Sequence, residues 1–164
     1  MENEKNMKFA DVIIKVMQII LGILSVGSVV GICGTIIIRV NPGLVPFVKD
    51  TTKLIAYLNN TVFPSLIALI IFSIMLILGL ELLRKIISEL VKKQVSNVKV
   101  LELLKKLLIG EVVYGIARVT LELLPINVEE NLISILPVGG NYIELIITIM
   151  VTYISYVAIS RTIN

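Results

Sequence analysis

The chain contains no histidine and no tryptophan, and it has a single cysteine, Cys33. The lack of histidine excludes His-ligated haem, zinc sites of the His/Cys type and every triad that uses an imidazole base. One cysteine cannot form an intramolecular disulfide. Because Cys33 lies within an apolar run, we interpret it as a small packing residue. We therefore expect no metal site and no cofactor.

Charged residues are also scarce, at 16% of the 164 residues, whereas 57% are hydrophobic and the mean hydropathy is +0.99. A soluble domain of this size cannot bury so much apolar side chain, so a bilayer is the natural solvent. The length suits a single domain of four membrane spans at about 20 residues each. No room remains for a conventional catalytic domain, and we expect that the protein is not an enzyme.

The apolar runs place the four spans at about 16–39, 62–83, 104–124 and 142–160. Two shorter amphipathic segments, 46–58 and 127–136, are typical of interfacial helices that lie on the membrane surface. Helical periodicity continues past the second span and resumes before the third, which predicts a helical hairpin over about 84–103. The expected fold is an all-α integral membrane four-helix bundle, forming one domain over 1–164, with short interfacial helices and a cytoplasmic hairpin.

The distribution of lysine and arginine between the spans predicts the orientation. Eleven of these residues fall in the N-terminal segment, the hairpin and the C-terminal tail, against three in the first outer segment, Arg39, Lys49 and Lys53. Loops rich in Lys and Arg stay on the cytoplasmic side. We therefore expect a multi-pass protein of the cell membrane whose two termini and hairpin are cytoplasmic.

A polar stripe lies within the third span and consists of Glu111, Tyr114, Arg118 and Glu122. At about 100° per residue, the side chains of Glu111, Gly115, Arg118 and Glu122 fall within a narrow arc of one helix. Charges cannot face acyl chains cheaply, so this face must look into a bundle.

Two interpretations of the polar stripe remain open. In the structural one, Glu122 one turn above and Glu111 two turns below neutralise Arg118 and orient the helix, while Glu111 also lies close enough to the cytoplasmic surface to snorkel. In the functional one, Arg118 faces a polar cavity where it binds an anion or gates an ion path, and Glu111 changes protonation. Tyr114 either donates to one of these charges or packs.

Two further sets of residues are candidates for helix packing. Gly27, Gly31 and Gly34 form a glycine seam on one face of the first span, which permits ordinary bundle packing, a dimer contact or docking of the polar stripe. A second polar face lies on the fourth span, where the hydroxyls either bond between helices or line a pathway. It comprises Glu144, Thr148, Thr152 and Ser155.

The basic hairpin is the candidate for contact with lipid or a partner through Arg84, Lys85, Lys92, Lys93, Lys105 and Lys106. Juxtamembrane Lys and Arg are attracted to anionic headgroups of the inner leaflet, and we favour these over a protein partner. Nucleic acid is disfavoured, because the segment has no aromatic residue for base stacking.

Two local patches carry a family resemblance. The first is an acid followed by basic residues at the end of the second span, Leu80–Lys85 (LELLRK), and the second is Tyr114–Arg118 (YGIAR). With the order of the elements, they resemble the phosphate-starvation-inducible E (PsiE-like) family of small four-helix membrane proteins. The chain departs from that family in a longer hairpin and in an inserted outer segment, 126–140. The resemblance implies an association with phosphate limitation and directs attention to Glu81 and Arg118.

These observations favour one function and leave an alternative. The favoured hypothesis is a scaffold, sensor or accessory subunit, a homo-oligomer or part of a membrane complex, that packs through the glycine seam and the polar stripe and contacts anionic lipid through the hairpin. The alternative is a small transporter or channel for protons or anions that uses Glu111 and Arg118.

Overall fold

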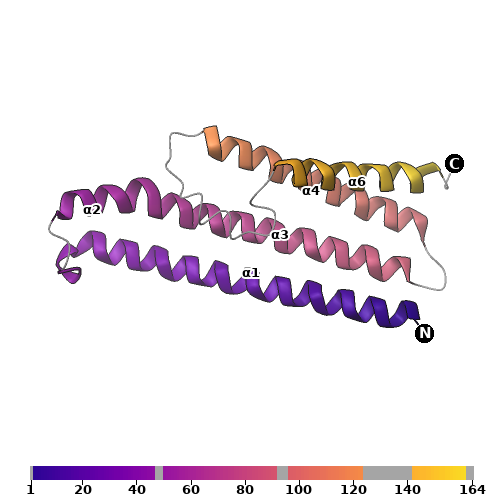
Figure 1. Cartoon of the computed structure of the whole chain (residues 1–164), viewed down its shortest axis with the longest axis horizontal. Coiled ribbons are helices and arrows are strands. Elements are labelled where there is room, and N and C mark those ends of the chain that lie inside the picture. The colour runs from indigo at the N-terminus through magenta and orange to yellow at the C-terminus, as the bar shows by residue number, and fades with distance from the viewer. Residues whose placement is uncertain (1, 47–49, 92–95, 124–141, 162–164) are drawn as a thin grey trace.

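The computed structural model describes residues 2–46, 50–91, 96–123 and 142–161, with side chains from Phe9 onward and, in the third long helix, up to Leu121. All described elements are helical. Four long helices run antiparallel in succession, α1 (Glu2–Val40), α3 (Phe63–Leu90), α4 (Asn97–Leu123) and α6 (Tyr142–Arg161). Figure 1 shows the N-terminal end of α1 and the C-terminal end of α6 at the same end of the molecule.

The first connection is made by two short elements. Helix α1 ends before Pro42, which lacks a backbone donor, and a 3₁₀ turn, η1 (Pro42–Leu44), reverses the chain. Asp50 then caps helix α2 (Thr51–Tyr57), because its side chain accepts a hydrogen bond from the backbone N–H of Lys53 at 3.1 Å.

Helix α2 continues directly into α3, which differs from the separate interfacial helix predicted over 46–58. A π-helical turn, η2 (Leu58–Val62), joins the two, and the whole helix runs from Thr51 to Leu90. In this wider turn the N–H of Phe63 donates to the carbonyl of Leu58. The next residue, Pro64, has no backbone N–H and therefore needs no hydrogen-bond acceptor. The helix therefore passes Pro64 without a break. The second predicted interfacial helix, 127–136, lies outside the described residues.

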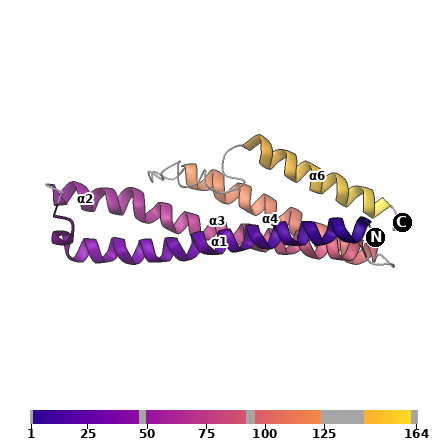
Figure 2. The same ribbon diagram turned by 60° about the horizontal axis from the view of Figure 1, so that its bottom comes forward.

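The four helices pack in a row, since α1 contacts α3, α3 contacts α4 and α4 contacts α6 (Figure 2). One buried cluster joins all four helices through Leu21, Ala68, Leu69, Phe72, Tyr114 and Leu145. A second cluster, Ile86, Val100 and Leu104, joins the end of α3 to the start of α4, and Tyr156 and Ile159 of α6 cover it.

The predicted hairpin is therefore present as the packed ends of α3 and α4, but it does not stand apart from the bundle. On one side α6 covers it, and on the other Asp11 of α1 accepts a hydrogen bond from Nε of Arg84 at 2.5 Å. Neighbouring helices thus hold the hairpin on both sides, α6 through apolar contacts and α1 through an ion pair.

Three of the described helices are long and apolar enough to cross a membrane, over Phe9–Val40, Thr51–Leu90 and Tyr142–Arg161. Helix α4 is not among them, because Glu111, Arg118 and Glu122 all lie in its apolar part. Its role as the third of the four spans stays a prediction.

Candidate polar site between α4 and α6

The stripe on α4 faces α6, the helix that covers it. The Thr152 hydroxyl donates a hydrogen bond to Oε1 of Glu111 at 2.9 Å. One turn further along α4, a Cβ atom added to Gly115 would lie 3.2 Å from Leu145. Arg118 follows, covered by the first residue of α6. Helical spacing therefore brings these three positions of α4 onto a single neighbouring helix.

Arg118 is sheltered within the bundle, with only 6% of its surface exposed. Its guanidinium carbon lies 4.5 Å from the centre of the Tyr142 ring, a cation–π arrangement that is stronger when solvent is excluded. The register of the helices places Arg118 beside the middle of the apolar part of α3, because Tyr114 one turn earlier contacts Phe72. A charge beside so apolar a helix would need such shelter if the bundle crosses a membrane.

Of the neutralising network predicted within α4, the contact between Glu111 and Arg118 is not formed. Glu111 bonds Thr152 of α6 rather than Arg118, which lies two turns away on the same helix. The side chain of Glu122 lies outside the described residues. The carboxylate and the guanidinium therefore occupy separate contacts along the α4–α6 interface.

Tyr114, unlike Glu111 and Arg118 of the same stripe, packs against α3. Its ring is 5% exposed and packs edge-on against Phe72, with the ring centroids 5.1 Å apart and the planes at 66°. This is a favourable geometry for two aromatic rings. Of the two roles predicted for Tyr114, the structure gives it the packing role.

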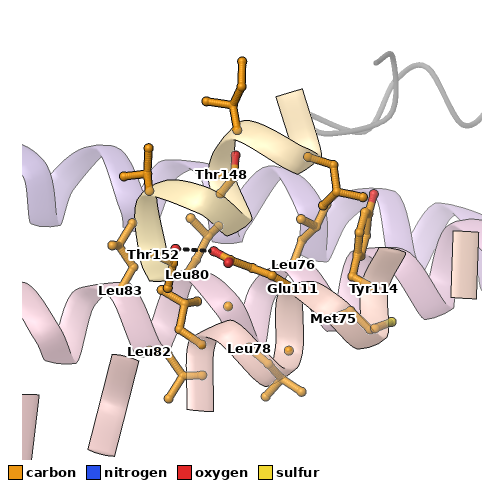
Figure 3. A pocket seen from close by; sticks show the side chains of 16 residues that line it. Met75, Leu76, Leu78, Leu80, Leu82, Leu83, Glu111, Tyr114, Thr148 and Thr152 are labelled. Atoms are coloured by element: carbon orange, nitrogen blue, oxygen red, sulfur yellow. Dashed lines mark hydrogen bonds between the residues drawn. The ribbon is translucent and has the colours of Figure 1, made fainter. Parts of the chain in front are cut away.

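A half-open cavity of about 560 Å³ adjoins Glu111 and is lined by residues of α3, α4 and α6 (Figure 3). Its walls are apolar except for Glu111, Tyr114 and two hydroxyl residues of α6, Thr148 and Thr152. Figure 3 shows the Glu111 side chain reaching from α4 toward Thr152. The second carboxylate oxygen, Oε2, is buried and has no hydrogen-bond partner among the described residues.

The polar face predicted on α6 divides into two kinds of contact. Thr152 bonds across to α4, as predicted for hydroxyls that join helices. Thr148 and Ser155 instead donate to backbone carbonyls of their own helix, those of Glu144 and Val151, at 2.8 Å each. Glu144 itself is exposed.

The glycine seam on α1 is not a continuous contact with the described helices. A Cβ atom on Gly31 would lie 3.1 Å from Leu66 of α3, whereas Cβ atoms on Gly27 and Gly34 would meet nothing within 4 Å. The face of α1 that α3 covers instead has heptad spacing, with Ile14, Leu21, Ser28 and Thr35 all buried.

This heptad is the signal that reasoning from the sequence missed. Ser28 and Thr35 on α1, and Ser65 on α3, donate to carbonyls of their own helices at 2.8, 2.9 and 2.6 Å. Their hydroxyls thus need no other partner, and their small side chains let the two helices approach closely.

The basic residues of the hairpin differ in how far they are engaged. Arg84 contacts Asp11 at 2.5 Å and Glu81 at 3.6 Å, and Lys85 contacts Glu81 at 3.7 Å. Arg84 is therefore part of the α1–α3 contact, and Asp11 is a partner that the sequence analysis did not single out. Lys92 and Lys93 lie outside the described residues.

The start of α4 carries the more solvent-exposed charges of the hairpin. Lys106 binds Glu102 at 2.7 Å, and its ammonium group holds the pKa of the Glu102 carboxyl below its usual range. Both side chains are exposed, and Lys105 beside them is exposed as well. This end of α4 can therefore meet anionic groups outside the bundle.

No group of three His, Cys, Asp or Glu residues that could hold a metal ion occurs in the part of the chain that the structure describes. What the fold and site define is an all-helical protein with three helices able to cross a membrane and a sheltered polar interface between α4 and α6. Comparisons with protein-family models, curated proteins and solved structures find no match. The resemblance to the PsiE-like family thus stays a prediction.

Proposed function

We propose that the protein is a four-span membrane protein that acts as a scaffold or accessory subunit and is completed by a partner within the membrane. The observation that carries this proposal is that most of the surface of α1 is not covered by another described helix. Helix α3 is its one long neighbour among the described elements. Large apolar side chains are exposed on the rest of α1, at Ile19, Ile23, Val26 and Val30, the last at 66%.

The exposed face of α1 has the composition of a helix-docking surface. Gly27, Cys33 and Gly34 lie on α1 with no close neighbour at either glycine, and Cys33 is exposed. Small residues on a lipid-facing helix permit a second backbone to approach, and van der Waals packing then drives association. A copy of this chain and a different membrane protein are both able to supply that helix.

The use made of the charged residues favours a scaffold over an ion path. Arg118 is covered by Tyr142 and Glu111 is bonded to Thr152, so both contribute to the contact between α4 and α6. The N-terminal end of α1 and the C-terminal end of α6 lie at the same end of the molecule, which supports an even number of spans. Cytoplasmic termini and binding of anionic headgroups by Lys105 and Lys106 complete the proposal.

Site-specific photocrosslinking in native membranes tests the scaffold role. A photoreactive residue at Val30 is expected to give a discrete protein adduct, whereas one at Ile116 of α4, which is 62% exposed, serves as the control and is expected to give lipid adducts alone. Differently tagged copies expressed together reveal whether the captured protein is a second copy. No protein adduct at Val30, or equal adducts at both positions, would contradict the proposal.

The cavity beside Glu111 favours a second candidate function, a small transporter. Liposomes that contain the purified protein are expected to show no proton or anion flux above that of empty liposomes if the scaffold role holds. A flux that Glu111→Gln abolishes in a folded protein would replace the scaffold role by transport. The link to phosphate limitation rests on the sequence resemblance, and the protein's abundance in phosphate-depleted cells tests it.

A further inference from the structure

The cavity between α3, α4 and α6 has the size and walls of a ligand site. Its volume of about 560 Å³ lies within the range of small-molecule pockets, roughly 300–1,000 Å³. Helix α3 lines it with aliphatic side chains, including Met75, Leu76 and Leu80, and with Gly79. An apolar body can therefore rest against α3.

The polar end of the cavity carries one carboxyl group among its described lining residues, that of Glu111. Thr152 donates a hydrogen bond to one of its oxygens, while the other is buried and has no partner among the described residues. An ionised carboxylate in apolar surroundings is costly unless a cation or a proton neutralises it. Neither Arg118 nor any other basic residue is among the described residues that line the cavity, so these supply no cation.

We propose that this cavity binds a lipophilic cation, whose apolar body packs against α3 and α6 and whose positive charge lies beside the carboxyl group of Glu111. Before the cation binds, a proton neutralises the carboxyl group. When the cation binds, that proton leaves to solvent, so the charge of the site is unchanged. This inference does not rest on the scaffold role, because the cavity lies on the α3–α4–α6 side and the proposed docking face lies on α1.

Two glycines make the space and provide a way to fill it. Gly79 and Gly110 both line the cavity, and a Cβ atom added to either would meet nothing within 4 Å. The first side-chain atom of a leucine at either position therefore meets no described neighbour, and the rest of the side chain is expected to take up volume of the cavity. Gly22 on α1 has equally open surroundings and does not line the cavity, so Gly22→Leu is the matched control.

Equilibrium dialysis of the purified full-length protein in detergent tests the proposal. The probes are tetraphenylphosphonium and tetraphenylborate, which share nearly the same shape and carry opposite charges. The wild-type protein is expected to bind the cation and not the anion. Glu111→Gln is expected to weaken cation binding by about tenfold or more, and Glu102→Gln, on the exposed start of the same helix, is expected to leave it unchanged.

The proton exchange predicts a specific pH dependence. Cation binding by the wild-type protein is expected to weaken as the pH falls, because protons compete for Glu111, and Glu111→Gln is expected to remove this dependence. The other titratable group among the described lining residues is the Tyr114 phenol, which stays neutral in acid. Helices α3 and α6 contribute no titratable side chain to that lining.

Filling the cavity separates a built site from adsorption to the detergent-covered surface. Gly79→Leu and Gly110→Leu are expected to lose cation binding, while Gly22→Leu keeps it, in samples whose circular dichroism matches the wild type. Absence of cation binding by the wild-type protein would overturn the proposal. Equal binding of tetraphenylborate, or full binding by Glu111→Gln, would also overturn it and indicate a lipid or neutral occupant.

Discussion

At the scale of single residues, the bond between Thr152 and Glu111 is a polar link between α4 and α6. Thr148 lies one turn away on the same helix, and its hydroxyl donates to its own backbone at 2.8 Å. The two threonines therefore share their chemistry, their helix and their cavity, yet one joins two helices and the other does not.

Replacing each threonine by valine, which has nearly the same shape, separates these roles. Thr152→Val leaves an oxygen of Glu111 without its donor, and we expect it to lower the free energy of unfolding by about 1 kcal/mol. Thr148→Val is expected to change it by less than about 0.5 kcal/mol. Reversible unfolding in mixed micelles, followed by circular dichroism, measures both. Equal losses would show that the Glu111 contact contributes nothing.

Helical geometry made part of this site predictable from the sequence. Glu111, Gly115 and Arg118 fall on one face of α4 however the neighbouring helices are placed. Because charged side chains on that face cannot face acyl chains cheaply, the sequence predicted a helix that covers them. The partners were not predictable, because Thr152 and Tyr142 meet them only in one tertiary register of α6 against α4. The role of Tyr114 also depended on tertiary contact, since its ring packs on Phe72 of α3.

At the scale of elements, the α1–α3 pair shows how two largely apolar helices pack without a contrast in polarity. Both helices are apolar over most of their surface, so hydrophobic periodicity does not mark the covered face. The buried face is marked instead by small residues at heptad spacing, Ser28 and Thr35 on α1 and Ser65 on α3. A glycine triplet on a neighbouring face gave the stronger pattern and predicted a broader seam than the described contacts contain.

Two glycines of that triplet provide a matched test of the α1–α3 contact. Gly31→Leu forces extra volume against Leu66, and we expect it to lower the free energy of unfolding by roughly 1–3 kcal/mol. Gly34→Leu projects into open space and is expected to leave the stability of the single chain unchanged. Unfolding in mixed micelles measures the stability. Similar losses for the two variants would refute the assigned face.

If Gly34 lies in a contact with a second copy, a different quantity changes. Native mass spectrometry is then expected to show fewer oligomers for Gly34→Leu, even though its folding is intact. The same measurement on Gly22→Leu, which is also open, shows whether any added bulk on α1 has that effect.

At the scale of the whole molecule, four long helices alternate in direction, and the described ends of the chain lie at one end of the bundle (Figure 1). The four-helix order was predictable because a stretch of about 20 apolar residues is unusual for any other reason. Two features were not predictable. The π turn that carries α2 into α3, and the cover that α1 and α6 give the hairpin, both depend on how neighbouring elements fit.

This arrangement predicts that tags at the two termini are reached from the same side of a membrane. In sealed inverted vesicles we expect protease to remove an N-terminal and a C-terminal tag together, because the Lys and Arg distribution places both on the cytoplasmic side. In right-side-out vesicles both are expected to survive. Removal of one tag alone would rule out an even number of spans.

The central claim is that α4 crosses the membrane with its charged face sheltered by α6. Spin labels placed singly along 109–120 in a Cys33→Ala protein, reconstituted in liposomes, test it by power-saturation electron paramagnetic resonance. The account predicts oxygen accessibility that peaks at the exposed positions Ile109, Ile116 and Val119, falls at Tyr114 and Arg118, and is accompanied by negligible access for an aqueous nickel reagent. Nickel access along the whole helix, or oxygen maxima at Glu111 and Arg118, would contradict it.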